Sequence, residues 1–155
     1  MTAHWDGRIE ALAERLRSRG YRLTPQRLAV VEALLADGSH PSAADVSAKV
    51  RERHPMVSLA TVYQTLDVLK ELGEVLELDF GEGFSRYDAR HPYPHPHAIC
   101  ARCGAVHDVH DASPIDIAAW ASRATGFAIH GYRLDFYGLC PCCRGSDTSS
   151  APEGS

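Results

Sequence analysis

The sequence lacks the features of several large protein classes. It has no apolar run near the ~20 residues that a membrane-spanning helix requires. Its first residues mix charged and apolar side chains without the apolar core of a signal peptide, which predicts a cytoplasmic protein. It also has no HExxH zinc-protease motif, no phosphate-binding Walker loop and no GxSxG nucleophile motif. We therefore expect neither an enzyme nor a small organic substrate.

What the chain does contain is unusual in two residue types and in its charge pattern. Its 155 residues include five cysteines and nine histidines, which in a reducing compartment favour metal or redox chemistry over disulfides. The net charge is −4, but residues 8–27 carry six arginines against two glutamates, whereas residues 74–155 carry six basic against eleven acidic residues. An anionic partner is therefore expected for the first half only.

The first half has the pattern of a winged helix. Apolar residues at helical spacing predict a helix over residues 6–18, and Thr24-Pro25, Ser42 and Ser58 are N-cap signals for three more. Alternating side chains then predict a hairpin, with strands over residues 75–80 and 84–87. We expect a winged helix-turn-helix domain over residues 1–88.

The second half is separated from the first by a proline-rich segment. Residues 89–96, ARHPYPHP, hold three prolines and predict a linker. Beyond it we expect a small α/β domain over residues 97–143 and a disordered tail over 144–155, which makes the fold class α+β. Within that domain the pattern predicts two short strands in 97–110, a helix from Ser113-Pro114 to about Thr125 and a long strand over 127–139.

Four of the cysteines form two Cys-x-x-Cys knuckles. Each knuckle offers two thiolates on one tight turn, and Gly104 suits the first turn. Because the paired knuckles can surround one ion tetrahedrally, they predict a closed, structural Zn²⁺ site. The alternative is that the cysteines are free thiols, or that two of them form a disulfide reversibly. Cys142 is a fifth cysteine outside the predicted ligand positions, and we expect that it does not bind the metal. The four predicted zinc ligands are Cys100, Cys103, Cys140 and Cys143.

A His-x-His pair, His95 and His97, precedes the first knuckle. Alternate residues of a strand point the same way, so both imidazoles can face one ion, although surface histidines alone give the same pattern. Imidazole with carboxylate suits Fe²⁺, Mn²⁺ or Zn²⁺. The candidate partners are His40, Asp88, His91, His107, Asp108 and His110.

The fourth predicted helix has a face suited to DNA. It places small, aromatic and amide side chains together, as a recognition helix in the major groove requires, although a solvated helix face would show the same pattern. Nearby arginines can contact phosphates or probe the minor groove. The candidate DNA-contacting residues are Ala60, Thr61, Tyr63, Gln64, Arg19, Arg22 and Arg27.

Over residues 9–143 the chain resembles the ferric uptake regulator family of metal-dependent repressors. The resemblance is carried by GYRLTPQR (20–27), HPSAADV (40–46), SLATVYQTLDVLKELG (58–73), HPHAICARCGAVHD (95–108) and FYGLCPCC (136–143). It implies a C-terminal dimerisation domain and a cytoplasmic homodimer that binds an A·T-rich inverted repeat in double-stranded DNA when loaded with metal.

The resemblance also implies a regulatory Fe²⁺ or Mn²⁺ site at the hinge. Its ligands would be His40, Asp88, His95, His97 and Asp108, with His91 as a substitute for Asp88. Aspartate at positions 88 and 108 resembles the peroxide-sensing branch, in which iron promotes oxidation of a ligand histidine; His40 and His95 are then the targets. An iron-responsive uptake repressor is the alternative. A further metal site of the iron and zinc sensors is not expected, because its positions hold Pro94, Pro96, Ile115 and Tyr132.

Two hypotheses from other classes stay open at this point, a metalloenzyme and a zinc-stabilised interaction module, whereas a thioredoxin-like role is not expected. A hydrolytic or redox metalloenzyme would need an open metal position beside a general base, and Asp108 is the one carboxylate at the right motif position. A thioredoxin-like role would need a Cys-x-x-Cys that opens a helix, whereas these knuckles are expected between strands. A purely zinc-stabilised interaction module would leave the His-x-His pair and the face of the fourth helix without a purpose.

Overall fold

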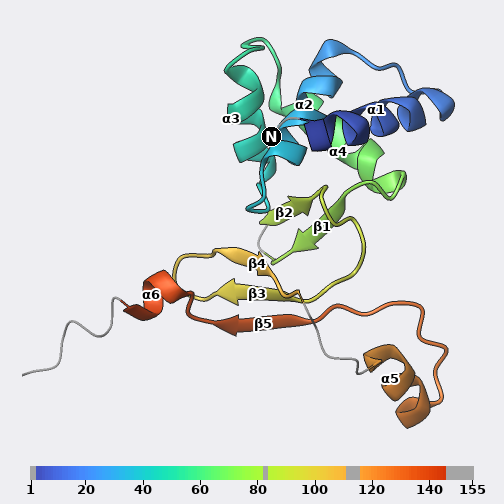
Figure 1. Cartoon of the computed structure of the whole chain (residues 1–155), viewed down its shortest axis with the longest axis vertical. Coiled ribbons are helices and arrows are strands. Elements are labelled where there is room, and N and C mark those ends of the chain that lie inside the picture. Colours follow the sequence, from blue (N-terminus) through green and yellow to red (C-terminus); the bar gives the residue numbers. More distant parts are fainter. Residues whose placement is uncertain (1–2, 82–83, 111–115, 146–155) are drawn as a thin grey trace, which may run out of the picture. The chain divides into compact units, whose positions relative to one another are not determined.

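The computed structural model describes residues 3–81, 84–110 and 116–145 and divides the chain into two compact units, Met1–Tyr93 and Pro94–Ser155 (Figure 1). The point of division, between Tyr93 and Pro94, falls in the proline-rich segment. Helices and small sheets occur in both units, which confirms the predicted α+β class.

The N-terminal unit consists of four helices and a hairpin. The helices are α1 (Ala3–Ser18), α2 (Pro25–Ala36), α3 (Ala43–Arg51) and α4 (Leu59–Glu71), and the strands are β1 (Leu76–Asp79) and β2 (Ser85–Asp88). The two strands pair antiparallel, with Leu76 opposite Asp88. This order of helices and hairpin is that of a winged helix-turn-helix.

Local capping explains where these helices begin. The Thr24 hydroxyl accepts the Arg27 N–H at 3.2 Å, and Pro25 fills the first helical position, where no N–H is needed. At α3, Ser42 and Asp45 form a reciprocal capping box. Ser58 caps α4. These predicted N-caps are all confirmed.

One core holds the unit together. All four helices contribute buried apolar side chains to it, and the hairpin adds Tyr87. Leu59, which begins α4, is 44% exposed and does not belong to this core. The fully buried members of the core include Leu12, Leu16, Val30, Leu34, Val46, Val62, Leu66 and Leu69.

The C-terminal unit is built around a three-stranded sheet of order β4-β3-β5. β3 (His97–Cys100) pairs antiparallel with β4 (Val106–Asp108) and parallel with β5 (Asp135–Gly138). Two helices complete the described part, α5 (Ile117–Thr125) and α6 (Pro141–Gly145). Of the unit's described residues, only Pro96, His97, Cys100 and Val106 are buried.

Four expectations for this unit need correction. The long strand over 127–139 is limited to β5, because the partner strand β3 offers only four residues to pair with. α5 begins at Ile117 with Asp116 as its N-cap, while Ser113 and Pro114 lie outside the described residues. Arg144 and Gly145 belong to α6 rather than to a tail, whose remaining residues are also outside the described part. The second knuckle opens α6 instead of lying between strands.

Candidate metal centres and DNA-binding face

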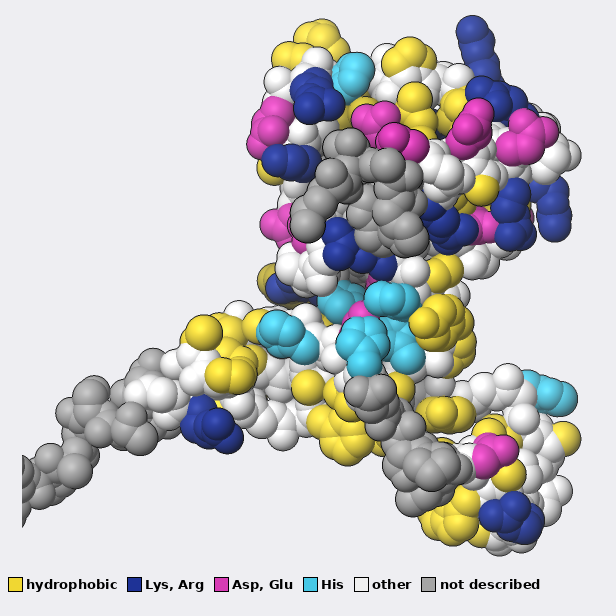
Figure 2. All heavy atoms as spheres, in the orientation of Figure 1, with side chains coloured by type: hydrophobic (Ala, Val, Ile, Leu, Met, Phe, Trp, Pro, Cys, Tyr) yellow, Lys and Arg dark blue, Asp and Glu magenta, His cyan; other side chains and the backbone are white. Residues whose placement is uncertain are grey.

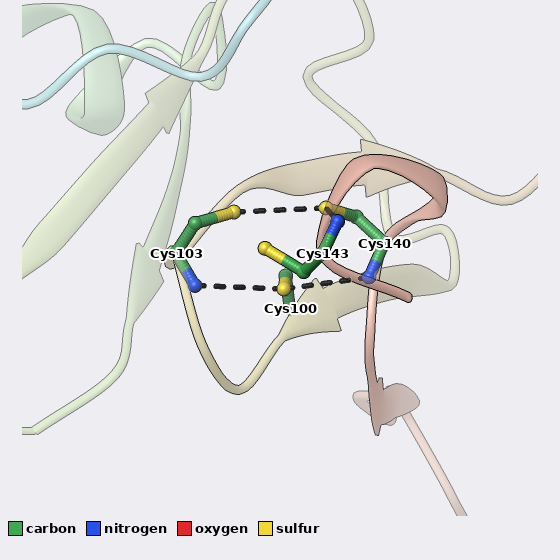
Figure 3. A group of neighbouring side chains, drawn as sticks. All are labelled: Cys100, Cys103, Cys140 and Cys143. Atoms are coloured by element: carbon green, nitrogen blue, oxygen red, sulfur yellow. Dashed lines mark hydrogen bonds between the residues drawn. The ribbon is translucent and has the colours of Figure 1, made fainter. Parts of the chain in front are cut away.

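The four cysteines of the two knuckles converge at one end of the β4-β3-β5 sheet (Figure 3). Their sulfur atoms all lie within 4.8 Å of one another, and the Cys103 and Cys140 sulfurs are 3.7 Å apart. Tetrahedral zinc with bonds of about 2.3 Å separates its sulfur ligands by about 3.8 Å. The cluster therefore fits a Zn(Cys)4 site.

Backbone geometry holds the thiols in place. The first knuckle turns at Gly104, whose φ of +74° is a conformation that glycine adopts without strain. Backbone N–H groups of Cys103 and Cys140 donate to the Cys100 sulfur at 3.5 and 3.4 Å, and the Cys143 N–H donates to Cys140 at 3.4 Å. Such donors stabilise thiolates, the form that binds metal.

The ionisation of the cluster also points to a cation. Hydrogen bonds from the backbone of Cys103 and Cys140 lower the pKa of the Cys100 thiol to about 5. The hydrogen bond with the Cys140 side chain raises the pKa of the Cys143 thiol to about 12. Four adjacent thiolates repel one another, so a divalent ion is what allows all four to lose their protons together.

One further contact in this cluster is not predicted by either cysteine motif. Nη1 of Arg102, which lies between the two cysteines of the first knuckle, donates to the Cys143 carbonyl oxygen at 2.9 Å. The arginine thus joins the two knuckles by a bond that involves no thiol. Cys142 is exposed and is not part of the four-sulfur group.

In the N-terminal unit, two of the predicted regulatory ligands face each other. His40 lies between α2 and α3, Asp88 ends β2, and both are buried. Nε2 of His40 is 3.5 Å from Oδ2 of Asp88, and Nδ1 of His91 is 3.9 Å from the same oxygen. His91 therefore lies beside this pair, as its predicted role as a substitute ligand requires.

The charge of Asp88 is set by opposing effects. Burial raises its pKa, but hydrogen bonds from His40 and from the N–H groups of His91 and Arg90 outweigh burial and lower the pKa to about 2. The carboxylate is therefore ionised at neutral pH, the form in which it can bind a cation.

In the C-terminal unit, three further predicted ligands form a second group. Oδ1 of Asp108 lies 2.9 Å from Nε2 of His95 and 3.7 Å from Nε2 of His97. The imidazole rings are 4.3 Å apart, although His95 precedes the strand that was expected to align them. His107 and His110 belong to neither group. Imidazole and carboxylate donors together suit Fe²⁺, Mn²⁺ or Zn²⁺.

Asp135, a carboxylate next to His97, was not predicted as part of the site from the sequence. Asp135 stands opposite His97 in the parallel pairing of β3 and β5, with its Oδ1 3.7 Å from Nδ1 of His97. Arg133 holds the other oxygen at 2.6 Å. Carboxylates in this position orient the ring of a ligating histidine. Only the register of β5 against β3 could have revealed it.

The predicted DNA-contacting residues differ in accessibility. Ala60, Tyr63 and Gln64 are exposed on α4, whereas the Thr61 hydroxyl lies 3.0 Å from that of Ser58 at the start of the helix. Among the arginines, Arg19 and Arg22 are exposed, and Arg27 is half-buried with Nη1 donating to the Arg22 carbonyl oxygen at 2.7 Å. Figure 2 shows many basic side chains on the visible face of this unit, interspersed with acidic ones.

The structure also bears on one arginine of the basic segment and on one position of the further metal site that is not expected. Arg15, one of the six arginines of residues 8–27, forms an ion pair with the buried Glu74. Of the positions expected to lack a further metal site, Ile115 lies outside the described residues.

Comparison with known proteins gives consistent matches. The model of the ferric uptake regulator family matches residues 18–137. The "Ferric uptake regulation protein" of Bacillus subtilis is 41% identical over 147 residues, covering 92% of this chain and 99% of that protein. The "Peroxide operon regulator" of the same organism is 38% identical over 143 residues, covering 92% and 96%. A zinc uptake regulator solved with zinc and DNA is 29% identical, with a TM-score of 0.66 and coverage of 92% and 97%.

Proposed function

Because the chain belongs to the ferric uptake regulator family, we propose that it is a homodimeric repressor that binds an A·T-rich inverted repeat when loaded with metal. Members of the family are metal-dependent transcriptional regulators rather than enzymes. Because a repressor acts on DNA, we propose that the protein works in the cytoplasm. No helix among the described residues combines the length and apolar character needed to cross a membrane.

The observation that carries the proposal is the distribution of the histidine and aspartate ligands. One pair, His40 with Asp88, belongs to the N-terminal unit, and one triad, His95 with His97 and Asp108, belongs to the C-terminal unit. We propose that one Fe²⁺ or Mn²⁺ ion is bound by both sets. The ion would restrict the segment between the units, so that the two recognition helices of a dimer reach successive major grooves.

Each unit supplies one further part of this function. The exposed face of α4, with Ala60, Tyr63 and Gln64, is the proposed major-groove reader, and Arg19, Arg22 and Arg27 are proposed phosphate contacts. The C-terminal unit is the proposed dimerisation domain, stabilised by Zn²⁺ in the four-cysteine cluster. It exposes large apolar side chains that a partner copy would cover. They include Trp120, Phe127, Phe136 and Tyr137.

Metal-dependent DNA binding tests this proposal. Fluorescence anisotropy of an A·T-rich inverted repeat is measured with and without Mn²⁺, for the wild-type protein and for His40→Ala and Asp108→Asn. His54→Ala is the matched control, since His54 belongs to neither ligand group. We expect Mn²⁺ to induce binding in the wild type and the control only. Equal binding by the metal-free wild type, or steady turnover of any substrate, would contradict the proposal.

We further propose that the regulator senses peroxide. Both carboxylates of the proposed site are aspartates, Asp88 and Asp108, as in the peroxide-sensing proteins that the chain resembles. With Fe²⁺ bound, hydrogen peroxide would add one oxygen atom to the imidazole of His40 or His95 and be reduced to water. An iron-responsive repressor is the second candidate, since the similar B. subtilis proteins include both a ferric uptake and a peroxide regulator.

Peptide mass spectrometry separates the two candidates. Protein loaded with Fe²⁺ is compared before and after a small excess of hydrogen peroxide, and protein loaded with Mn²⁺ is the control. Peroxide sensing predicts a gain of one oxygen in the peptide of His40 or of His95, in the iron-loaded protein alone. Unmodified histidines with iron still bound would favour the iron-responsive repressor.

A further inference from the structure

The side chain of Arg90 closes the C-terminal end of α2. Its Nε donates to the Leu35 carbonyl oxygen at 3.0 Å and its Nη2 to that of Ala36 at 2.9 Å. The last carbonyls of a helix have no partner within the helix, and the planar guanidinium presents two donors that suit two neighbouring carbonyls. Arg90 thereby ties the end of the hairpin to the end of α2.

The backbone of the same residue positions a proposed metal ligand. The N–H of Arg90 donates to Oδ1 of Asp88 at 2.8 Å, and the N–H of His91 donates to the same oxygen at 2.9 Å. These two bonds fix the carboxylate plane, and the second oxygen, Oδ2, is the one that lies 3.5 Å from His40. Arg90 therefore bonds Asp88 through its backbone N–H and bonds the end of α2 through its side chain.

The segment that carries His40 fits against the same region. His40 has a φ of +58°, which is uncommon for a residue other than glycine, and its carbonyl oxygen accepts a bond from Nη1 of Arg86 at 3.3 Å. Two residues earlier, a β-carbon added to Gly38 would lie only 2.5 Å from Nη1 of Arg90 and 3.1 Å from its Cζ. The guanidinium therefore occupies the space that a side chain at position 38 would need.

We propose that Arg90 is a positioning residue for the regulatory metal and that it depends on glycine at position 38. Seated over Gly38 and on the end of α2, its guanidinium holds His40 and Asp88 near ligand distance before the ion binds. Ligands that are ordered in advance lose less conformational freedom on binding. This inference rests on the proposed function, because it concerns the affinity of the same metal site.

Mn²⁺ titrations of four variants test the inference in the dimeric protein with its zinc retained. They are Arg90→Ala, Gly38→Ala, the double variant and the control Gly7→Ala, whose added β-carbon has no atom within 4 Å. Substitution of residues that orient metal ligands weakens metal binding roughly 10–100-fold. We expect losses in that range for Arg90→Ala and Gly38→Ala, and none for Gly7→Ala. The double variant should bind as Arg90→Ala does, because the group that clashes is gone.

Circular dichroism of the zinc-loaded, manganese-free variants restricts the comparison to those that are fully folded at the temperature of the titration. A general loss of stability then does not affect the measured affinities. The inference would be overturned if Arg90→Ala bound Mn²⁺ with wild-type affinity, or if Gly38→Ala lowered the Mn²⁺ affinity equally with and without Arg90. Either result would leave the proposed function standing. His40→Ala is titrated in parallel. If it binds Mn²⁺ as tightly as the wild type, the proposed ligand set is wrong and the role of Arg90 is overturned with it.

Discussion

Removal of the zinc is predicted to unfold the C-terminal unit and to leave the N-terminal unit folded. The reason is the difference between their interiors. In the described C-terminal residues only Pro96, Cys100 and Val106 are buried apolar side chains, whereas the N-terminal unit has a continuous core that joins all four helices. A small domain with so little buried apolar surface needs a metal or a partner chain to stay folded.

The expected magnitude follows from the same comparison. Complete burial of an aliphatic side chain such as Val106 contributes about 1.5–3 kcal/mol. Binding of a structural zinc ion contributes about 10–16 kcal/mol at neutral pH, most of it available as folding free energy. The ion therefore outweighs the apolar burial of the monomeric unit severalfold. The exposed apolar residues would add stability only after dimerisation.

Hydrogen exchange with peptide resolution measures this effect. Cys103→Ser is compared with Cys142→Ser, which leaves the four clustered cysteines intact. In Cys103→Ser we expect peptides from β3 and β5 to lose protection while peptides from α2 and α4 keep it, and in Cys142→Ser both should stay protected. Protected β3 and β5 in a zinc-free Cys103→Ser protein would refute the reasoning, as would equal losses in the two variants.

Three further predictions concern carboxylates that pair with histidine or arginine. The pKa of Asp88 in the metal-free protein is lowered to about 2 from an ordinary 3.8, so its contribution to stability is complete above pH 4 and is lost as the pH falls toward 2. Urea unfolding of Asp88→Asn should lack this loss, and the same acid dependence in both proteins would count against it. Asp135→Asn should weaken Mn²⁺ binding roughly 10-fold without releasing zinc, and unchanged affinity would show that Asp135 does not orient His97. Glu74→Gln should destabilise the N-terminal unit by roughly 1–3 kcal/mol in urea, since Arg8 and Arg15 lose a buried carboxylate, whereas Glu10→Gln should have no measurable effect.

Local sequence signals predicted the structure well wherever short-range chemistry decides it. The caps at Thr24, Ser42 and Ser58 each depend on residues within three positions, and the structure contains all of them. The turn at Gly104 is likewise a local requirement of the first knuckle. For the same reason the four-cysteine cluster could be predicted from two short motifs.

Features that depend on distant pairing could not be predicted. Residues 127–139 favour a strand by composition, but strand length is set by the four residues of β3. Nothing in the hairpin sequence indicates that Arg90 bonds carbonyls 54 and 55 residues away. The burial of Glu74 likewise depends on arginines of α1, far away in the sequence. Each of these contacts exists only once the helices and strands have assembled.

The central claim is that one regulatory ion is bound by ligands from both units. Calorimetric Mn²⁺ titrations of zinc-loaded wild type, His40→Ala, His97→Ala and the double variant test it most directly. A shared ion predicts that either single substitution removes most of the affinity for the same single ion, and that the double variant loses little more. Two independent sites would instead leave one intact binding event in each single variant and none in the double, and that result would contradict the account.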